Sequence, residues 1–190
     1  MIFNNKDFYK KSIEKFGISA QGVHWNSKYT QYKRFNIITK IIKKDIKNSS
    51  ILDAGCGFGE YYNYLQTIKK VPKKYIGIDR EKIMIDIAQK RFPTQEFKVV
   101  NILHDPIIET DYTISSGALS LLSYDECEIF IEKCYKASKK GFIFNYLKTL
   151  SFKSIKSFEI EQLAQNISLK QIIIKDNYLK NDFTIFMPKY

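Results

Sequence analysis

The stretch ILDAGCGFGEYYNYL, residues 51–65, constrains the fold of this chain more than any other part of the sequence. A short apolar run ends at an acid, Asp53, and glycines follow at every second position, Gly55, Gly57 and Gly59. A helical pattern then resumes. Glycine is costly to order, but it adopts backbone angles that other residues avoid and lets the chain approach a ligand closely. The stretch therefore predicts a strand, a tight turn with a ligand beside it, and a helix.

Strand-like and helix-like segments alternate along the chain after residue 49. We expect strands over residues 50–53, 74–79, 96–100, 112–116 and 141–147. We expect helices over residues 58–70, 81–91, 123–138 and 157–166, the third opened by a capping box of Ser123 and Glu126. Residues 168–190 indicate two antiparallel strands joined by a turn near 177–181. This alternation is typical of an α/β fold, in which helices cover both faces of a mainly parallel sheet.

The first 48 residues are expected to form a helical extension. Residues 4–16 fit a short amphipathic helix, and apolar residues recur at helical spacing over 28–46. The intervening GISAQGVHWNS carries two glycines, which break the pattern. A length of 190 residues suits one domain. We expect a single domain over 1–190, with 1–48 as a cap over the site and 49–190 as the sheet core.

Composition excludes several classes of protein. The three cysteines, Cys56, Cys127 and Cys134, form no CxxC pair, which argues against disulfides and a zinc site, and Cys127 and Cys134 are expected to be buried core thiols. With only two histidines in the chain, we expect no metal site. No apolar run has the length of a membrane span, and the first residues lack the apolar core of a signal peptide, so we expect a cytoplasmic protein without membrane contact.

The formal net charge of +11 raises the question of a nucleic-acid partner. Only three of the basic residues are arginines, the side chain best suited to phosphates and base edges. The lysines cluster where helices should end, and there the helix dipole favours cations without any partner. These clusters comprise Lys43, Lys44 and Lys47; Lys69, Lys70, Lys73 and Lys74; and Lys136, Lys139 and Lys140. A solvated surface is therefore preferred to a nucleic-acid face.

The acids beside the glycine turn indicate the kind of ligand. Ligands of open parallel sheets bind outside the carboxyl ends of the strands, where this turn is expected. The sequence lacks the GxxxxGK[ST] pattern of a phosphate loop and the GxGxxG pattern of a dinucleotide loop. Asp53 would repel a pyrophosphate but suits a cationic amino group. Asp79 ends the second strand, where its carboxylate can accept hydrogen bonds from both hydroxyls of a ribose. A nucleoside with an amino-acid tail therefore fits better than NAD.

These motifs resemble those of the class I S-adenosylmethionine-dependent methyltransferases. ILDAGCGFGE is similar to the first motif of that family and YIGIDRE to the second. FKVVNILHD and DYTISSGALSLL stand where the third and fourth strands end. The resemblance covers roughly residues 50–147 and is to small stand-alone members. It implies a Rossmann-like, doubly wound, seven-stranded sheet of order 3-2-1-4-5-7-6 with the last strand antiparallel, and S-adenosylmethionine as the cofactor.

The resemblance also implies a set of cofactor-binding residues. They are Asp53, Gly55, Cys56, Gly57, Asp79, Arg80, Asn101, Ile102 and Ser116, and Arg34 is a further candidate because of its place on the apolar stripe of the helix before the first motif. Asp53 would hold the methionine part of the cofactor and Asp79 the ribose. Asn101 stands where the family commonly has an aspartate that contacts the adenine amino group, and an asparagine oxygen can accept the same bond. Ser116, with Gly117, would border the transferred methyl.

Arg34 and His24 have two interpretations each. Arg34 either clamps the cofactor carboxylate, a role that Gln31 would share, or packs its stem and extends its head to water. His24 is either a general base or, as we prefer, a surface residue. Ser116 is the other catalytic candidate, and no residue is identified as an obligatory base.

Methyl transfer from a sulfonium depends on orientation and on exclusion of water, and it needs a base only when the acceptor must lose a proton first. The motifs, and the absence of any added recognition domain within the 190 residues, lead us to expect a methyltransferase acting on a small molecule or a glycan precursor. Two alternatives stay open: an RNA methyltransferase, and a cofactor-binding protein without turnover. The oligomeric state is undetermined.

Overall fold

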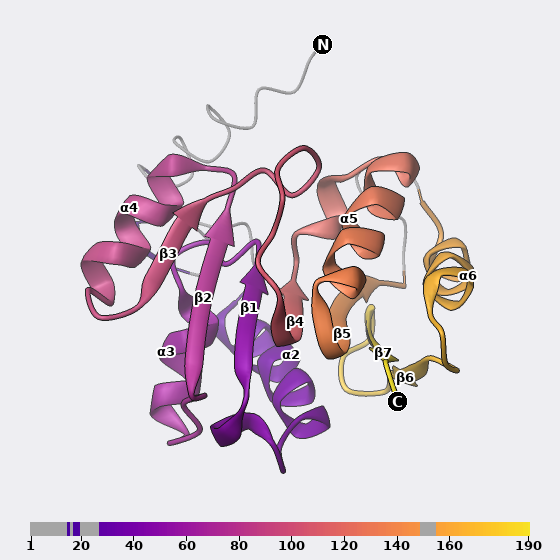
Figure 1. Cartoon of the computed structure of the whole chain (residues 1–190), viewed down its shortest axis with the longest axis horizontal. Coiled ribbons are helices and arrows are strands. Elements are labelled where there is room, and N and C mark those ends of the chain that lie inside the picture. The colour runs from indigo at the N-terminus through magenta and orange to yellow at the C-terminus, as the bar shows by residue number, and fades with distance from the viewer. Residues whose placement is uncertain (1–14, 16, 20–26, 149–154) are drawn as a thin grey trace.

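The computed structural model describes residues 15, 17–19, 27–148 and 155–190 (Figure 1). The helix expected over 4–16 lies outside these residues except for Lys15, which is helical, and His24 lies outside them too. The next expected helix is α2 (Lys28–Ile41), and the Ser27 Oγ accepts a hydrogen bond from the Thr30 amide at its start. It ends five residues earlier than predicted, and a short 3-10 helix, η2 (Ile46–Asn48), leads into the sheet. Among the residues described, no helix combines the length and the apolar character needed to cross a membrane.

Seven strands form one sheet with the order β3-β2-β1-β4-β5-β7-β6, which confirms the predicted topology. The strands are β1 (Ser50–Ala54), β2 (Lys74–Asp79), β3 (Glu96–Val99), β4 (Thr110–Ser116), β5 (Ser138–Leu147), β6 (Ile173–Lys175) and β7 (Asp182–Pro188). The first five run parallel, and β7 runs antiparallel to its neighbours β5 and β6. Because β1 and β4 are adjacent in the order but not in the chain, the order reverses there. That position is where open α/β sheets bind ligands.

Helices cover both faces of the sheet, as expected (Figure 1). They are α3 (Glu60–Thr67), α4 (Lys82–Arg91), α5 (Tyr124–Lys136) and α6 (Ser157–Ile167), with a short η3 (Leu119–Leu121). One core cluster joins apolar residues of α2, α3 and α4 to one face, and a second joins α5 and α6 to the other. The capping box of Ser123 and Glu126 is present at the start of α5. Cys127 and Cys134 are fully buried in the second cluster, as predicted for core thiols.

A polar cluster joins the amino ends of the strands, on the edge of the sheet opposite the glycine turn. The Lys140 Nζ lies 2.5 Å from Asp45 Oδ2 and 3.9 Å from Asp111 Oδ1. Asp111 Oδ2 also accepts hydrogen bonds from the amide and the hydroxyl of Ser50. The hydrogen bond from Lys140 lowers the pKa of Asp45. Burial alone would raise the pKa of Asp111, but the bonds from Ser50 and the charge of Lys140 lower it.

Replacing Lys140 by methionine should destabilise the fold in a pH-dependent way. Folded-state pKa values below the unfolded ones stabilise the fold at neutral pH, and this stabilisation is lost as the pH falls through the folded values. Because the pair is partly exposed, we expect a loss of about 0.5–1 kcal/mol at pH 7 and a smaller loss near pH 3. Urea unfolding at both pH values measures the two differences. Equal losses at pH 7 and pH 3 would contradict an electrostatic role for Lys140.

Candidate cofactor and active site

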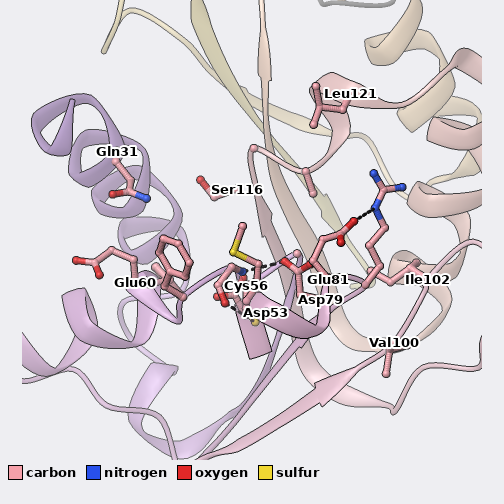
Figure 2. A pocket seen from close by; sticks show the side chains of 18 of the residues that line it. Gln31, Asp53, Cys56, Glu60, Asp79, Glu81, Val100, Ile102, Ser116 and Leu121 are labelled. Carbon is pink, nitrogen blue, oxygen red and sulfur yellow. Dashed lines mark hydrogen bonds and ion pairs between the residues drawn. The ribbon is translucent and has the colours of Figure 1, made fainter. Parts of the chain in front are cut away.

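The carboxyl ends of β1, β2 and β4 open into a pocket of about 500 Å³. Small-molecule sites typically have volumes of roughly 300–1,000 Å³. The predicted cofactor residues that line it are Asp53, Gly55, Cys56, Gly57, Asp79, Arg80, Asn101, Ile102 and Ser116. Figure 2 shows Asp53, Cys56 and Asp79 together at the floor of the pocket, with Gln31 and Ser116 above them in the view. The structure thus brings together residues from four separate segments that the sequence had singled out.

The glycine turn has the backbone conformation that only glycine adopts readily. Gly55 has a φ of +80°, and a Cβ built there would lie 2.6 Å from the Cβ of Ala118. The amides of Gly55 and Cys56 both donate to the carbonyl of Ile78, which ties the turn to β2. The positive φ and the close approach of the chain after β4 together explain why glycine is needed at position 55.

Replacing Gly55 by alanine should damage both the fold and the pocket. Left-handed strain alone costs about 1–2 kcal/mol, and the contact with Ala118 adds to it. Gly17→Ala is a matched control, because Gly17 has a φ of +64° but no described atom lies within 4 Å of the added Cβ. We expect Gly55→Ala to lower the melting temperature more than Gly17→Ala does. An equal effect of the two substitutions would contradict the close approach at Gly55.

Asp53 is a buried carboxylate at the floor of the pocket. Its side chain is 2 % exposed, and its Oδ2 accepts a hydrogen bond of 2.5 Å from the Tyr75 hydroxyl. Burial raises the pKa of Asp53 to about 7; the Tyr75 hydrogen bond opposes this rise and the charge of Asp79 adds to it. Within the described part of the chain, no basic side chain pairs with Asp53. A buried acid without a cationic partner favours a cationic group on a ligand.

Asp79 connects the glycine turn to the start of α4. Its Oδ2 accepts a 3.0 Å hydrogen bond from the Gly57 amide, and its Oδ1 accepts a 2.9 Å bond from the Glu81 amide. Burial raises the pKa of Asp79, although both amide hydrogen bonds act in the opposite direction. Each carboxylate oxygen has a second acceptor position. Asp79 can therefore fix the turn and still accept hydrogen bonds from two ribose hydroxyls.

The residues after β2 and β3 line the pocket on one side of Asp79. Arg80 lies with its Nε 3.4 Å from Glu81 Oε1. The Asn101 Oδ1 accepts a hydrogen bond from the Leu103 amide, which closes a tight turn after β3. The side-chain amide of Asn101 keeps its donor Nδ2 and one acceptor position for a ligand. Val100, Ile102 and Leu103 add an apolar surface, which is suited to a flat aromatic base.

The structure supports neither interpretation of Arg34. Its side chain is buried between α2 and β7, where its Nε pairs with Asp182 Oδ1 at 2.5 Å. It does not line the pocket, so the predicted clamp on the cofactor carboxylate is wrong, and its head does not extend to water either. The reason is that this part of α2 packs against the start of β7. Gln31, one turn earlier, is 3 % exposed and does line the pocket, as does Lys28.

One wall of the pocket was missed by the sequence analysis. Arg91 pairs with Glu60 at 2.7 Å and donates to the Phe58 carbonyl. Glu60 also accepts hydrogen bonds from Tyr32 and Asn63. Burial opposes ionisation of Glu60, but these donors outweigh it and lower its pKa. An acid in the first turn after the glycines was the available signal for Glu60, whereas nothing in the sequence pairs Arg91 with a residue 31 positions away.

Ser116, one of the two catalytic candidates, lies at the carboxyl end of β4. Its Oγ donates to Asn145 Oδ1 at 2.8 Å, and Asn145 Nδ2 donates to Thr184 Oγ1 at 2.6 Å. This arrangement holds Ser116 in place, but among the described residues it gives the Ser116 hydroxyl no basic partner that would take its proton. His24 lies outside the described residues, so its role stays a prediction. Cys56 remains a thiol, because burial raises its pKa well above the usual value.

Comparison with known proteins decides the family. Residues 51–141 match the family model described as a methyltransferase domain. Residues 51–141 form a methyltransferase domain, as the resemblance to the class I S-adenosylmethionine-dependent methyltransferases implied. The predicted family is thus confirmed, and S-adenosylmethionine is the cofactor of this family.

Two solved structures and one curated relative are similar to this chain. A TehB-like SAM-dependent methyltransferase from Corynebacterium glutamicum superposes with a TM-score of 0.69 at 17 % identity, covering 97 % of this chain and 98 % of that one. Magnesium protoporphyrin IX methyltransferase from Synechocystis with bound SAM gives 0.66 at 13 % identity, covering 97 % and 85 %. Malonyl-[acyl-carrier protein] O-methyltransferase of Hamiltonella defensa subsp. Acyrthosiphon pisum is 22 % identical over 86 % of this chain, which covers 62 % of that protein. The structural matches show the fold alone.

Proposed function

We propose that this chain transfers a methyl group from S-adenosylmethionine to a small-molecule acceptor, such as a metabolite or a glycan precursor. The observation that carries the cofactor part is the pair of acids at the pocket floor. Asp53 is buried without a cationic partner in the described part of the chain. Each carboxylate oxygen of Asp79 accepts a hydrogen bond from one backbone amide and keeps a second acceptor position for a ligand. The ammonium group and the ribose hydroxyls of S-adenosylmethionine are the groups that such a pair would bind.

The charges around the pocket support a small acceptor over RNA. Among the residues that the structure describes, the basic side chains lining the pocket are Lys28, Arg80 and Arg91. Arg80 pairs with Glu81, and Arg91 pairs with Glu60. A phosphate backbone is bound by several cations that neutralise it, and these two arginines are already neutralised by acids. The lysine clusters before β1, β2 and β5 lie at the amino ends of the strands, on the edge opposite the pocket.

The proposed mechanism rests on orientation. When bound, S-adenosylmethionine would supply a methyl group carried on a positively charged sulfur. A lone pair of the acceptor would take the methyl carbon, and the sulfur would keep the bonding electrons as a neutral thioether. Asp53 would hold the amino-acid tail and Asp79 the ribose, with Ser116 and Gly117 bordering the reacting methyl. Two fixed ends restrict the motion of the group between them, which is how positioning lowers the barrier. We assign no general base, and a proton on the acceptor would pass to solvent.

The acceptor class can be tested with the purified chain. Labelled S-adenosylmethionine is incubated with a low-mass metabolite extract and, separately, with total RNA, and S-adenosylhomocysteine is measured. We expect product with the metabolite extract and none with RNA. Product with RNA alone would overturn the small-molecule proposal, and no product with either fraction would favour binding without turnover. The cytoplasmic location stays a prediction from the sequence, as does the single-domain organisation with its cap.

A further inference from the structure

A tyrosine beneath the pocket floor contacts the carboxylate that is proposed to bind the cofactor. Tyr75 lies in β2 opposite Ile51 of β1, and its hydroxyl extends along the sheet to Asp53 Oδ2. Both side chains are buried, each 2 % exposed. Tyr75 does not line the pocket. It can therefore act on a ligand only through Asp53.

We propose that Tyr75 is a positioning residue that holds Asp53 ionised and oriented toward the ammonium group of the cofactor, and so sets the pH range in which ligands with the amino-acid tail bind. The proposal rests on the cofactor role of Asp53 given above. It concerns a residue that neither the glycine motif nor the resemblance to the family singled out.

The surroundings of Asp53 leave few groups that can stabilise its charge. Within the described part of the chain, the titratable groups that interact with it are Asp79 and Tyr75 of β2, Cys56 of the glycine turn and Tyr61 of α3. None of them is a cation, and Asp79 raises the pKa of Asp53. Burial raises the pKa of Cys56, Tyr61 and Tyr75, so all three stay neutral at physiological pH. Among the described side chains, the Tyr75 hydroxyl is the donor that contacts Asp53.

The packing around Tyr75 keeps this hydroxyl in place. Its ring meets Phe97 edge-on, with centroids 6.1 Å apart, and lies 4.9 Å from the ring of Tyr62. Residues 75, 77 and 79 point to the same face of β2, and position 77 is a glycine opposite Asp53. A Cβ on Gly77 would lie 2.5 Å from the Phe97 ring and 2.9 Å from the Cys56 sulfur. The missing side chain at position 77 leaves the space in which these groups pack beneath Asp53.

The direct test compares two ligands that differ in the amino-acid tail. S-adenosylhomocysteine carries the tail, and 5′-methylthioadenosine lacks it. Calorimetric titrations of wild type and Tyr75→Phe are run at several pH values between about 6 and 8. If the variant raises the Asp53 pKa by about one unit, the affinity for S-adenosylhomocysteine falls about tenfold at pH 6 and about twofold at pH 8. Binding of 5′-methylthioadenosine should not change at either pH.

Two control variants separate this role from a general structural one. Tyr62→Phe removes a phenol from the same aromatic cluster without removing a contact to Asp53, and it should leave both affinities unchanged. In an Asp53→Asn background, Tyr75→Phe should cause no further loss. Equal weakening of the two ligands by Tyr75→Phe, or an unchanged pH profile for S-adenosylhomocysteine, overturns the proposal. A wild type that binds neither ligand instead contradicts the proposed function, and this proposal falls with it.

Discussion

Asp53→Asn should abolish most of the cofactor affinity and at the same time stabilise the ligand-free protein. Loss of a charged hydrogen bond to the ammonium group costs about 2–3 kcal/mol, so we expect affinity to fall by about thirtyfold to more than a hundredfold at pH 8. The asparagine oxygen can still accept the hydrogen bond from Tyr75, which keeps the floor of the pocket in place. Calorimetry with S-adenosylmethionine measures the loss.

The stability part follows from the direction of the pKa shift. Burial raises the folded pKa of Asp53 to about 7, above the value of about 3.9 expected for an unfolded chain. Between these values the folded state keeps a proton that the unfolded state has lost, so stability falls as the pH rises. Asparagine removes this penalty. We expect Asp53→Asn to raise the melting temperature at pH 8 but to change it little near pH 4, and a variant less stable than wild type at pH 8 would contradict the argument.

Asp79→Ala should remove the ribose contacts and loosen the glycine turn together. It deletes the acceptor for the amides of Gly57 and Glu81 as well as the bonds to the ligand. Two lost hydrogen bonds of about 1 kcal/mol each correspond to at least about a tenfold loss of affinity. The control is Asp86→Ala on the same side of the sheet, because Asp86 lies exposed on α4 and pairs only with Lys82 among the described residues.

Calorimetric titration of both variants with S-adenosylmethionine gives the comparison. We expect Asp86→Ala to bind like wild type and Asp79→Ala to bind at least about tenfold more weakly. Wild-type affinity in Asp79→Ala would show that the ribose lies elsewhere in the pocket. Equal weakening in the two variants would indicate a general effect of removing acids rather than a specific contact.

The sequence was sufficient for the sheet and for the pocket floor because local patterns determine both. Strand and helix periodicity predicted the elements, and the acids Asp53 and Asp79 stand at the ends of adjacent strands in a βα turn of known geometry. Positive φ at Gly55 agrees with the reason given for the glycine. These features depend on residues close together in the chain.

The errors concern contacts between distant segments. The sequence predicted that Arg34 either clamps the cofactor carboxylate or extends its head to water, but only the docking of α2 on β7 shows that Asp182 is its partner, 148 positions away. The same applies to Arg91 with Glu60 and to Tyr75 with Asp53. Tyr75 reads in the sequence as an ordinary apolar strand residue. Its hydroxyl gains a role only because β1 and β2 pair in a register that places it beneath the acid.

Titration of S-adenosylmethionine into the wild-type chain tests the central claim most directly. The claim is that the pocket at the ends of β1, β2 and β4 is a cofactor site whose two acids bind opposite ends of one ligand. The account predicts saturable binding at one site in the micromolar range, about −8 kcal/mol, which weakens as the pH falls below about 7 as Asp53 becomes protonated. No saturable binding at pH 8 would contradict it.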